Sequence, residues 1–234
     1  MLIGYGNNMN NPSRFQFAFR ILHMTDRKRT PLSSRKKPQQ ARSADLVQAI
    51  LEAAIQVLAQ EGAQRFTTTR VAERAGVSVG SIYQYFPNKA SILFRLQSDE
   101  WQQTTRMLRD TLEDTTRPPF ERLRRLVHAF VKSECDEAPI RVALDDAAPL
   151  YRDAPEAAEV RAASDGTIAR FLREALPGVA KPRRDLAARL LKSTLSNVGK
   201  DFSESPRTDK EIAAWSDAMA DMFCAWLASL TPRR

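Results

Sequence analysis

The sequence predicts an all-α protein in which an N-terminal three-helix helix-turn-helix domain precedes a larger helical domain. Apolar residues recur at helical spacing through most of the chain, and only eight glycines interrupt its 234 residues. Between residues 67 and 89, two short helical segments flank a single tight turn. We expect the first of three N-terminal helices just before this pair.

That first helix is predicted from Ala44 to about Gln60, with Gly62 ending it. Phe66 follows the helix and is expected to fill the joint between it and the next two helices. The apolar residues of the predicted helix recur on one face: Leu46, Val47, Ile50, Leu51, Ala54, Ile55 and Leu58.

The second helix is short and has clear signals at both ends. Thr67 and Thr68 are good N-cap residues, and Gly76 can take the positive φ that closes a helix. Ser78 then caps a third helix, so the two helices enclose a tight turn.

The third helix is predicted from Val79 to Phe86, and Pro87 prevents its continuation. Ile82 and Phe86 are four residues apart and share the inward face. The side chains expected to point elsewhere are Ser81, Gln84 and Tyr85.

Small hydroxyl and amide side chains on such a face fit the major groove of DNA. Gly80 lets the backbone approach a phosphate, and Lys89 places a cation near the DNA backbone. An ordinary helical hairpin has the same spacing, so the two helices alone leave both interpretations open.

The segment from about Ser43 to Gln97 resembles the DNA-binding domain of the TetR family of bacterial transcriptional repressors. The matching residues follow one order along the chain: Ile50, Ala53, Ala54, Leu58, Glu61, Gly62, Phe66, Thr67, Thr68, Val71, Ala72, Ala75, Gly76, Val77, Ser78, Gly80, Ile82, Tyr83, Tyr85, Phe86, Lys89 and Leu93.

This resemblance implies a set of DNA contacts. Backbone phosphates would be met by Thr68, Ser78 and Gly80, and the sugar-phosphate chain by Tyr83 and Lys89. The base edges or thymine methyls would be met by Ser81, Gln84 and Tyr85. Gln84 has the amide chemistry that pairs bidentately with adenine. Partial burial of Tyr83 against the first helix is an equal alternative.

Charge is unevenly distributed along the chain. Residues 1–97 contain 14 Lys and Arg against 5 Asp and Glu, whereas the remainder contains 22 against 23. Attraction to phosphate needs local cations, so the basic half is the half with the helix-turn-helix. Part of this charge lies among Pro and Ser before residue 43, as is typical of a disordered tail.

The expected domains are a disordered extension at 1–42, the helix-turn-helix domain at 43–103, and an effector-binding and dimerisation domain at 104–234. Residues 1–23 match no element of the family, and Met24 opens a more family-like stretch, so we hypothesise that Met24 is the initiator. Residues 15–24 suit neither a membrane span nor a signal peptide, which predicts a cytoplasmic protein without membrane partners.

The second half reads as a series of helices, of which the first is expected to link the two domains. The predicted ranges are 101–115, 120–135, 139–150, 160–176, 185–202 and 209–230.

The last two predicted helices carry wide apolar stripes. These comprise Leu186, Leu190, Leu191, Thr194, Leu195 and Val198, and then Ile212, Trp215, Met219, Met222, Phe223, Trp226 and Leu227. Ordinary core packing explains each residue singly, but together the stripes favour a dimer. The resemblance implies a homodimer through these helices that binds a palindromic double-stranded DNA operator.

The resemblance also implies a pocket for an unknown small-molecule effector. The expected liners are Trp101, Phe120, Phe130, Leu144, Tyr151 and Phe171, although aromatic residues at helical spacing are more often plain core. Asp145 and Asp146 can receive a cationic ligand, or can simply be solvated.

The residues do not favour an enzyme. The chain has only His23 and His128 with Cys135 and Cys224, and none is spaced as a metal motif, so we expect no catalytic residues, metal or cofactor. The cysteines suit buried small hydrophobes, with a thiol sensor as the alternative. The sequence predicts a ligand-responsive transcriptional repressor; the alternatives are a TetR-like activator and a nonspecific architectural DNA-binding protein.

Overall fold

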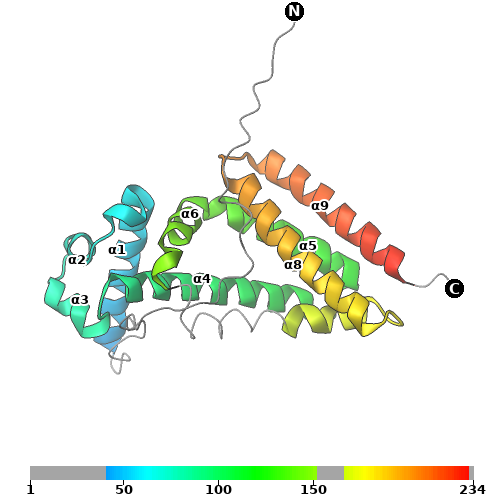
Figure 1. The fold of residues 1–234 in the computed structure, drawn as a ribbon, viewed down its shortest axis with the longest axis horizontal. Helices are drawn as coiled ribbons and strands as arrows, with labels where there is room; N and C mark the ends of the chain where they lie inside the picture. Colours follow the sequence, from blue (N-terminus) through cyan, green and yellow to red (C-terminus); the bar gives the residue numbers. More distant parts are fainter. Residues whose placement is uncertain (1–40, 152–165, 232–234) are drawn as a thin grey trace, which may run out of the picture. The chain divides into compact units, whose positions relative to one another are not determined.

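The computed structural model describes residues 41–151 and 166–231, and within these ranges every regular element is a helix (Figure 1), as predicted. The expectations for Met24, for residues 1–40 of the disordered extension and for a helix start near residue 160 lie outside the described residues. Residues 41 and 42, which were expected in the extension, instead belong to the first helix. The helices are α1 (Ala41–Arg65), α2 (Thr68–Ala75), α3 (Val79–Tyr85), α4 (Lys89–Leu112), α5 (Pro119–Asp136), α6 (Ala138–Ala147), the 3₁₀ helix η2 (Ala148–Leu150), a helix at 166–175, α8 (Lys181–Ser203) and α9 (Asp209–Leu230).

The caps around α2 and α3 confirm the local reading of the sequence. The Thr67 hydroxyl accepts a hydrogen bond from the Arg70 amide, and Ser78 Oγ accepts one from the Ser81 amide at 3.0 Å. Gly76 has φ 66°, so it ends α2 in the left-handed conformation. Because both caps are satisfied locally, the turn between the two helices is well defined.

The first hydrophobic core lies among α1, α2, α3 and the start of α4. Phe66, Ile82 and Phe86 are fully buried there, as the sequence predicts. The core also includes residues from α6 and the residue after η2: Ala143, Leu144, Ala147 and Tyr151. Helix α6 therefore packs on α1, which the predicted domain division at residue 103 does not anticipate.

Helix α4 begins earlier than the sequence predicts. The Asn88 side chain accepts from the Ser91 amide at 2.9 Å, and Ser91 Oγ closes a capping box on the Asn88 backbone. This cap starts the helix at Lys89 rather than near Trp101. The first core includes Ala90, Ile92, Leu93, Phe94 and Leu96 of α4. Leu108 and Leu112 lie in the second core, so one continuous helix joins the two cores.

The second core is formed by α5, α8, α9, the helix at 166–175 and the end of α4. Arg122 of α5 lies inside this core with 1% of its side chain exposed. Its guanidinium donates to the Leu112 carbonyl at 2.6 Å, pairs with Glu174 and lies over the Phe171 ring. A buried charge thus ties α5 to α4 and to the helix at 166–175.

The apolar stripes of α8 and α9 contain both buried and exposed residues. Leu191, Leu195, Ile212, Met219, Phe223 and Leu227 are buried in the second core. Other members face outward, with exposed fractions of 45% for Leu186, 43% for Leu190, 41% for Trp215 and 51% for Met222. Within the described ranges, no helix combines the length and apolarity that crossing a bilayer requires.

Candidate DNA-binding surface and effector cavity

The helix-turn-helix presents most of the predicted contact residues at its surface. Ser78, Gly80, Gln84 and Lys89 are exposed, and Thr68 and Ser81 are half-buried. These residues come from the start of α2, the start and outer face of α3, and the first residue of α4. A helix N-terminus leaves backbone N–H groups without helical partners, and such groups bind phosphate oxygens well.

Tyr83 projects from α3 with 42% of its surface exposed, so the structure favours a presented side chain over the alternative of burial. Its hydroxyl lies 3.4 Å from Thr68 Oγ1, although the two residues are 15 positions apart. The two hydroxyls thus lie at one place on the surface, where α2 and α3 meet.

Tyr85 is placed differently from the sequence expectation. Only 6% of its surface is exposed, and its ring belongs to the first core with Ile82 and Phe86. The reason is that Tyr85 is still in α3 and follows Ile82 by three residues, so both side chains lie on the inward side of the helix. We therefore leave Tyr85 out of the residues proposed to meet DNA bases.

Two arginines of α2 are already engaged within the protein. Arg70 pairs with Glu61, and Arg74 donates to Gln60 at 2.9 Å and to Gln56 at 3.4 Å, both on α1. These contacts fasten α2 to α1. Lys89 is exposed at the start of α4 and is the residue of this surface that best offers a charge to phosphate.

A cavity of about 530 Å³ lies among α4, α5, α6, α8 and the helix at 166–175. Its size is typical of small-molecule sites. Its apolar wall includes Trp101, Leu108, Phe130, Ile168 and Leu195, and polar or charged side chains line the rest.

Three of the six aromatic and aliphatic residues expected to line a pocket do so: Trp101, Phe130 and Tyr151. The other three are core residues. Leu144 packs in the first core, whereas Phe120 and Phe171 pack with the second, where Phe171 lies beneath the Arg122 guanidinium. Of the two neighbouring aspartates, Asp145 lines the cavity.

One end of the cavity holds an ionic cluster around Arg141 of α6. Its guanidinium lies 2.5 Å from a Glu100 carboxylate oxygen, 2.8 Å from one of Glu134 and 2.9 Å from one of Glu137. Glu100 also accepts from Thr104 at 3.0 Å and from Gln97 at 2.9 Å. We call Glu100, Glu134, Glu137 and Arg141 the Arg141 cluster.

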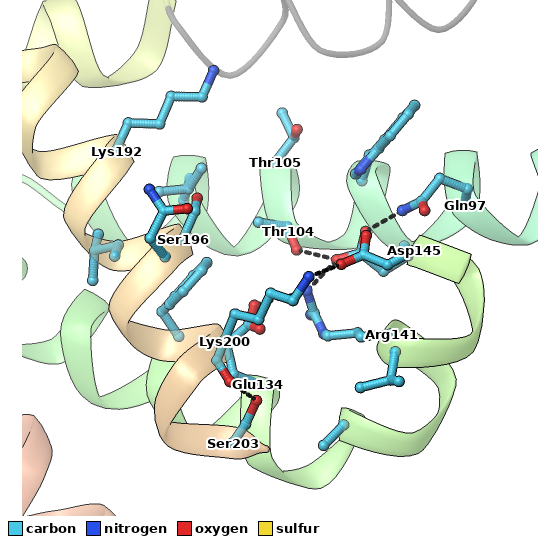
Figure 2. A pocket seen from close by; sticks show the side chains of 18 of the residues that line it. Gln97, Thr104, Thr105, Glu134, Arg141, Asp145, Lys192, Ser196, Lys200 and Ser203 are labelled. Carbon is cyan, nitrogen blue, oxygen red and sulfur yellow. Dashed lines mark hydrogen bonds and ion pairs between the residues drawn. The ribbon is translucent and has the colours of Figure 1, made fainter. Parts of the chain in front are cut away.

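Helix α8 contributes Lys192, Leu195 and Lys200 to the lining of the cavity. Figure 2 shows Lys200 reaching from α8 toward Asp145 of α6, with which it forms an ion pair, while Lys192 lies apart from them. Gly199 allows α8 to approach α5 closely, because a Cβ at this position would lie 3.1 Å from the Phe130 ring and 3.2 Å from Glu134 Cγ.

Burial and charge shift the acid–base behaviour of this cluster. Burial raises the pKa of Glu134 to about 7; the Arg141 guanidinium opposes this shift, and the carboxylates of Glu100 and Glu137 add to it. Burial likewise raises the pKa of Glu100. A single guanidinium therefore does not fully compensate the carboxylates around it.

Sequence reasoning missed the Arg141 cluster. The spacing of Glu137 and Arg141, four residues apart, indicates a helical ion pair, but such pairs are usually solvated. Glu100 and Glu134 come from two other helices, and no local pattern brings them together.

The two cysteines are partly buried and unpaired by any disulfide. Burial raises the pKa of both thiols, and Cys224 donates to the Phe120 carbonyl at 3.8 Å. A raised pKa lowers the fraction of reactive thiolate, which disfavours the thiol-sensor alternative.

Both halves of the chain match known protein families. Residues 50–96 match the family described as bacterial regulatory proteins, tetR family, and residues 118–230 match the tetracyclin repressor-like C-terminal domain. A curated relative, the fatty acid metabolism regulator protein of Bacillus subtilis (strain 168), is 38% identical over 68 residues. That match spans 29% of this chain and only 35% of the relative.

Solved structures share the fold over most of the chain. The fatty acid degradation regulator FadR from Bacillus halodurans has a TM-score of 0.61 and 20% identity, covering 80% of this chain and 96% of that one. FadR from Bacillus subtilis in complex with stearoyl-CoA has a TM-score of 0.59 and 17% identity, covering 75% of this chain and 96% of that one.

The regulator LfrR from Mycobacterium smegmatis in complex with proflavine gives a TM-score of 0.57 and 22% identity, covering 78% of this chain and 97% of that one. At these identities the likeness concerns the fold. The two family matches lie on the helix-turn-helix and on the helices that enclose the cavity, and the chain belongs to the tetR family of bacterial regulatory proteins.

Proposed function

We propose that this chain is a homodimeric transcriptional repressor that binds a palindromic operator and leaves it when a small molecule occupies the cavity. The observation that carries the proposal is the course of α4. Its first turns lie in the core of the helix-turn-helix, and Trp101, Thr104 and Leu108 farther along it line the cavity. One helix therefore contacts both the DNA-reading unit and the effector.

Helix α6 offers a second connection between the two sites. Arg141, Val142 and Asp145 line the cavity, whereas Ala143 and Leu144 pack in the first core. A ligand that binds one arrangement of α4 and α6 better than another shifts the population between them. In a dimer, such a shift changes the separation of the two α3 helices and thus their match to successive major grooves.

The proposed dimer uses the outward faces of α8 and α9. Leu186, Leu190, Trp215 and Met222 expose a large apolar area, which costs free energy in water and favours burial against a second copy. Trp215 is held in place by stacking on Phe202, with ring centroids 4.6 Å apart. A twofold protein of this kind matches a palindromic site.

The DNA contacts we propose are those that the structure exposes or half-exposes: Thr68, Ser78, Gly80, Ser81, Tyr83, Gln84 and Lys89. Gln84 is the residue with the chemistry to distinguish a base. Two proteins of similar fold are known in complex with stearoyl-CoA and proflavine, which supports binding of a small-molecule effector by this chain. These two ligands differ from each other, so they do not identify the ligand of this chain.

The test is to map the DNA that the protein binds in its host and then measure binding to a recovered site. We expect a few palindromic sites, steep salt dependence, and little competition from unrelated DNA at moderate salt. Equal competition by unrelated DNA would instead identify a nonspecific architectural protein. A promoter fusion then separates repression from activation, since deletion of the gene should raise expression from a repressed promoter.

A further inference from the structure

Most of the positive charge in the N-terminal part of the chain precedes the helix-turn-helix domain. Residues 1–40 contain eight Lys and Arg against one Asp, whereas residues 41–97 contain six against four Asp and Glu. Six of the eight cations form two groups, at residues 27–29 and 35–37, and no acidic residue lies between residue 27 and the start of α1. We call residues 27–37 the basic segment.

The folded helix-turn-helix domain itself offers few cations to DNA. Arg70 pairs with Glu61, Arg95 pairs with Asp99 at 2.9 Å, and Arg74 donates to two glutamines of α1. The residues proposed above to contact DNA include a single lysine, at the start of α4. A surface with one cation per protomer releases few counterions from DNA, so it provides little ionic attraction on its own.

We propose that the basic segment binds the phosphate backbone of the DNA beside the operator half-site and provides most of the ionic attraction between protein and DNA. This inference rests on the proposed function, to which it adds a contact outside the helix-turn-helix. Phosphate is the same in every DNA sequence, so the contact increases the affinity for the operator and for unrelated DNA alike.

The position of the basic segment in the chain favours DNA as its partner. The segment leads into α1, whose second turn already packs in the first core through Val47, together with Ile82 of α3. Ala41 follows Lys37 by four residues, and a chain of that length spans at most about 14 Å. When α3 binds a groove, these cations are therefore held near DNA at a high effective concentration.

The test uses the full-length protein and neutralises the two groups of cations separately. The first variant carries Arg27→Gln, Lys28→Gln and Arg29→Gln, and the second carries Arg35→Gln, Lys36→Gln and Lys37→Gln. The matched control removes three exposed cations from α4, the helix at 166–175 and α9: Arg106→Gln, Arg173→Gln and Lys210→Gln.

Binding to a recovered operator and to an unrelated duplex of the same length is measured by fluorescence anisotropy at several salt concentrations. In each of the two variants we expect the slope of log K against log salt to become shallower by about 2–5 per dimer, because each lost phosphate contact removes about 0.9. The affinity should fall by the same factor on both duplexes, so that the preference for the operator is retained. The control should keep the wild-type slope.

An unchanged slope in both variants would overturn the inference, as would an equal change in the control, which would indicate net charge rather than a contact. A change in one variant alone would confine the phosphate contact to that group of cations. Loss of affinity for the operator only would indicate base recognition and would also overturn the proposed phosphate contact.

The same variants are tested on vesicles that contain phosphatidylserine, because an anionic membrane also attracts basic segments. Weaker vesicle binding with unchanged DNA binding would assign the segment to a membrane instead. If no operator is recovered, the proposed repressor fails, whereas binding to the unrelated duplex still tests the basic segment. The two failures are therefore distinguishable.

Discussion

The side-chain hydroxyl of Tyr83 on α3 lies 3.4 Å from that of Thr68 at the first residue of α2. This contact joins the two helices of the helix-turn-helix at their exposed surface. A phosphate oxygen that reaches this point can accept from a hydroxyl and from the free N–H groups at the start of α2.

Replacing Tyr83 by Phe should therefore weaken operator binding while the fold stays stable. The lost hydroxyl is expected to cost about 1 kcal/mol of binding free energy, the typical net value of one hydrogen bond. Fluorescence anisotropy on a labelled operator at fixed salt measures the change. Tyr85→Phe makes the same chemical change at the buried neighbour and should leave affinity unaltered; an equal loss in both variants would contradict the assignment of Tyr83.

Tyr85→Ala should act on stability rather than on base recognition. The ring is buried with Ile82 and Phe86, so its removal leaves a cavity in the first core and is expected to cost about 3 kcal/mol. Urea unfolding followed by circular dichroism measures this loss, with Tyr83→Ala as the exposed control. Unchanged stability together with loss of sequence preference would return Tyr85 to the base-contacting residues.

Local signals predicted the helix-turn-helix well. Thr67, Gly76 and Ser78 act on the backbone within a few residues, and α9 has the predicted bounds because Thr208 and Glu211 form a capping box before its apolar positions. Tyr85 was assigned to the wrong face although it follows Ile82 by three residues, a spacing that places both side chains on one side of a helix.

The cavity could not be predicted in the same way. Its ionic end combines Glu100 of α4, Glu134 of α5 and Arg141 of α6, and their meeting depends on how whole helices pack. Trp101 and Phe130 were expected in the pocket and line it. Phe120 and Phe171 are also aromatic residues at helical spacing, but they pack with the second core. Periodicity marks an inward face without distinguishing a filled interior from a hollow one.

The proposed dimer predicts that a charge on the outward face of α8 separates the subunits. Leu190→Arg should give monomers by light scattering at micromolar concentration, because an arginine cannot be buried against an apolar partner without compensation. Leu150→Arg is the matched control, since Leu150 is equally exposed but lies on η2. If Leu190→Arg remains dimeric, the interface lies elsewhere.

We expect the buried polar contacts of Arg122 to be essential for the stability of the second core. Arg122→Met keeps much of the volume but leaves the Leu112 carbonyl without its donor, and we expect a loss of about 2–4 kcal/mol in unfolding free energy. Its partner Glu174 is half exposed, so Glu174→Gln should cost only about 0–1 kcal/mol. Chemical denaturation measures the free energy of unfolding of both variants. Equal losses would show that the ion pair itself provides the stabilisation.

The raised pKa of Glu134 predicts how the free energy of unfolding changes with pH. The native state raises the pKa of this carboxyl from 4.5 to about 7 through burial, with Glu100, Glu137 and Asp145 as neighbouring carboxylates and Arg141 opposing them. Lys200 of α8, which lines the same cavity, is paired with Asp145. A group that holds its proton more tightly when folded stabilises the protein fully below its unfolded pKa, and this contribution is lost as the pH rises through the folded pKa.

The variant Glu134→Gln has no proton to lose, so its stability relative to the wild type should increase between pH 5 and pH 8. The expected increase is about 1–3 kcal/mol, because the shifted carboxyl must ionise in the folded wild type over this interval. Urea unfolding of both proteins at each pH measures the difference. Glu121→Gln removes an exposed carboxyl from the same helix and should follow the wild-type curve. A constant difference between Glu134→Gln and the wild type across the range would show that Glu134 ionises in the folded protein as it does in the unfolded chain.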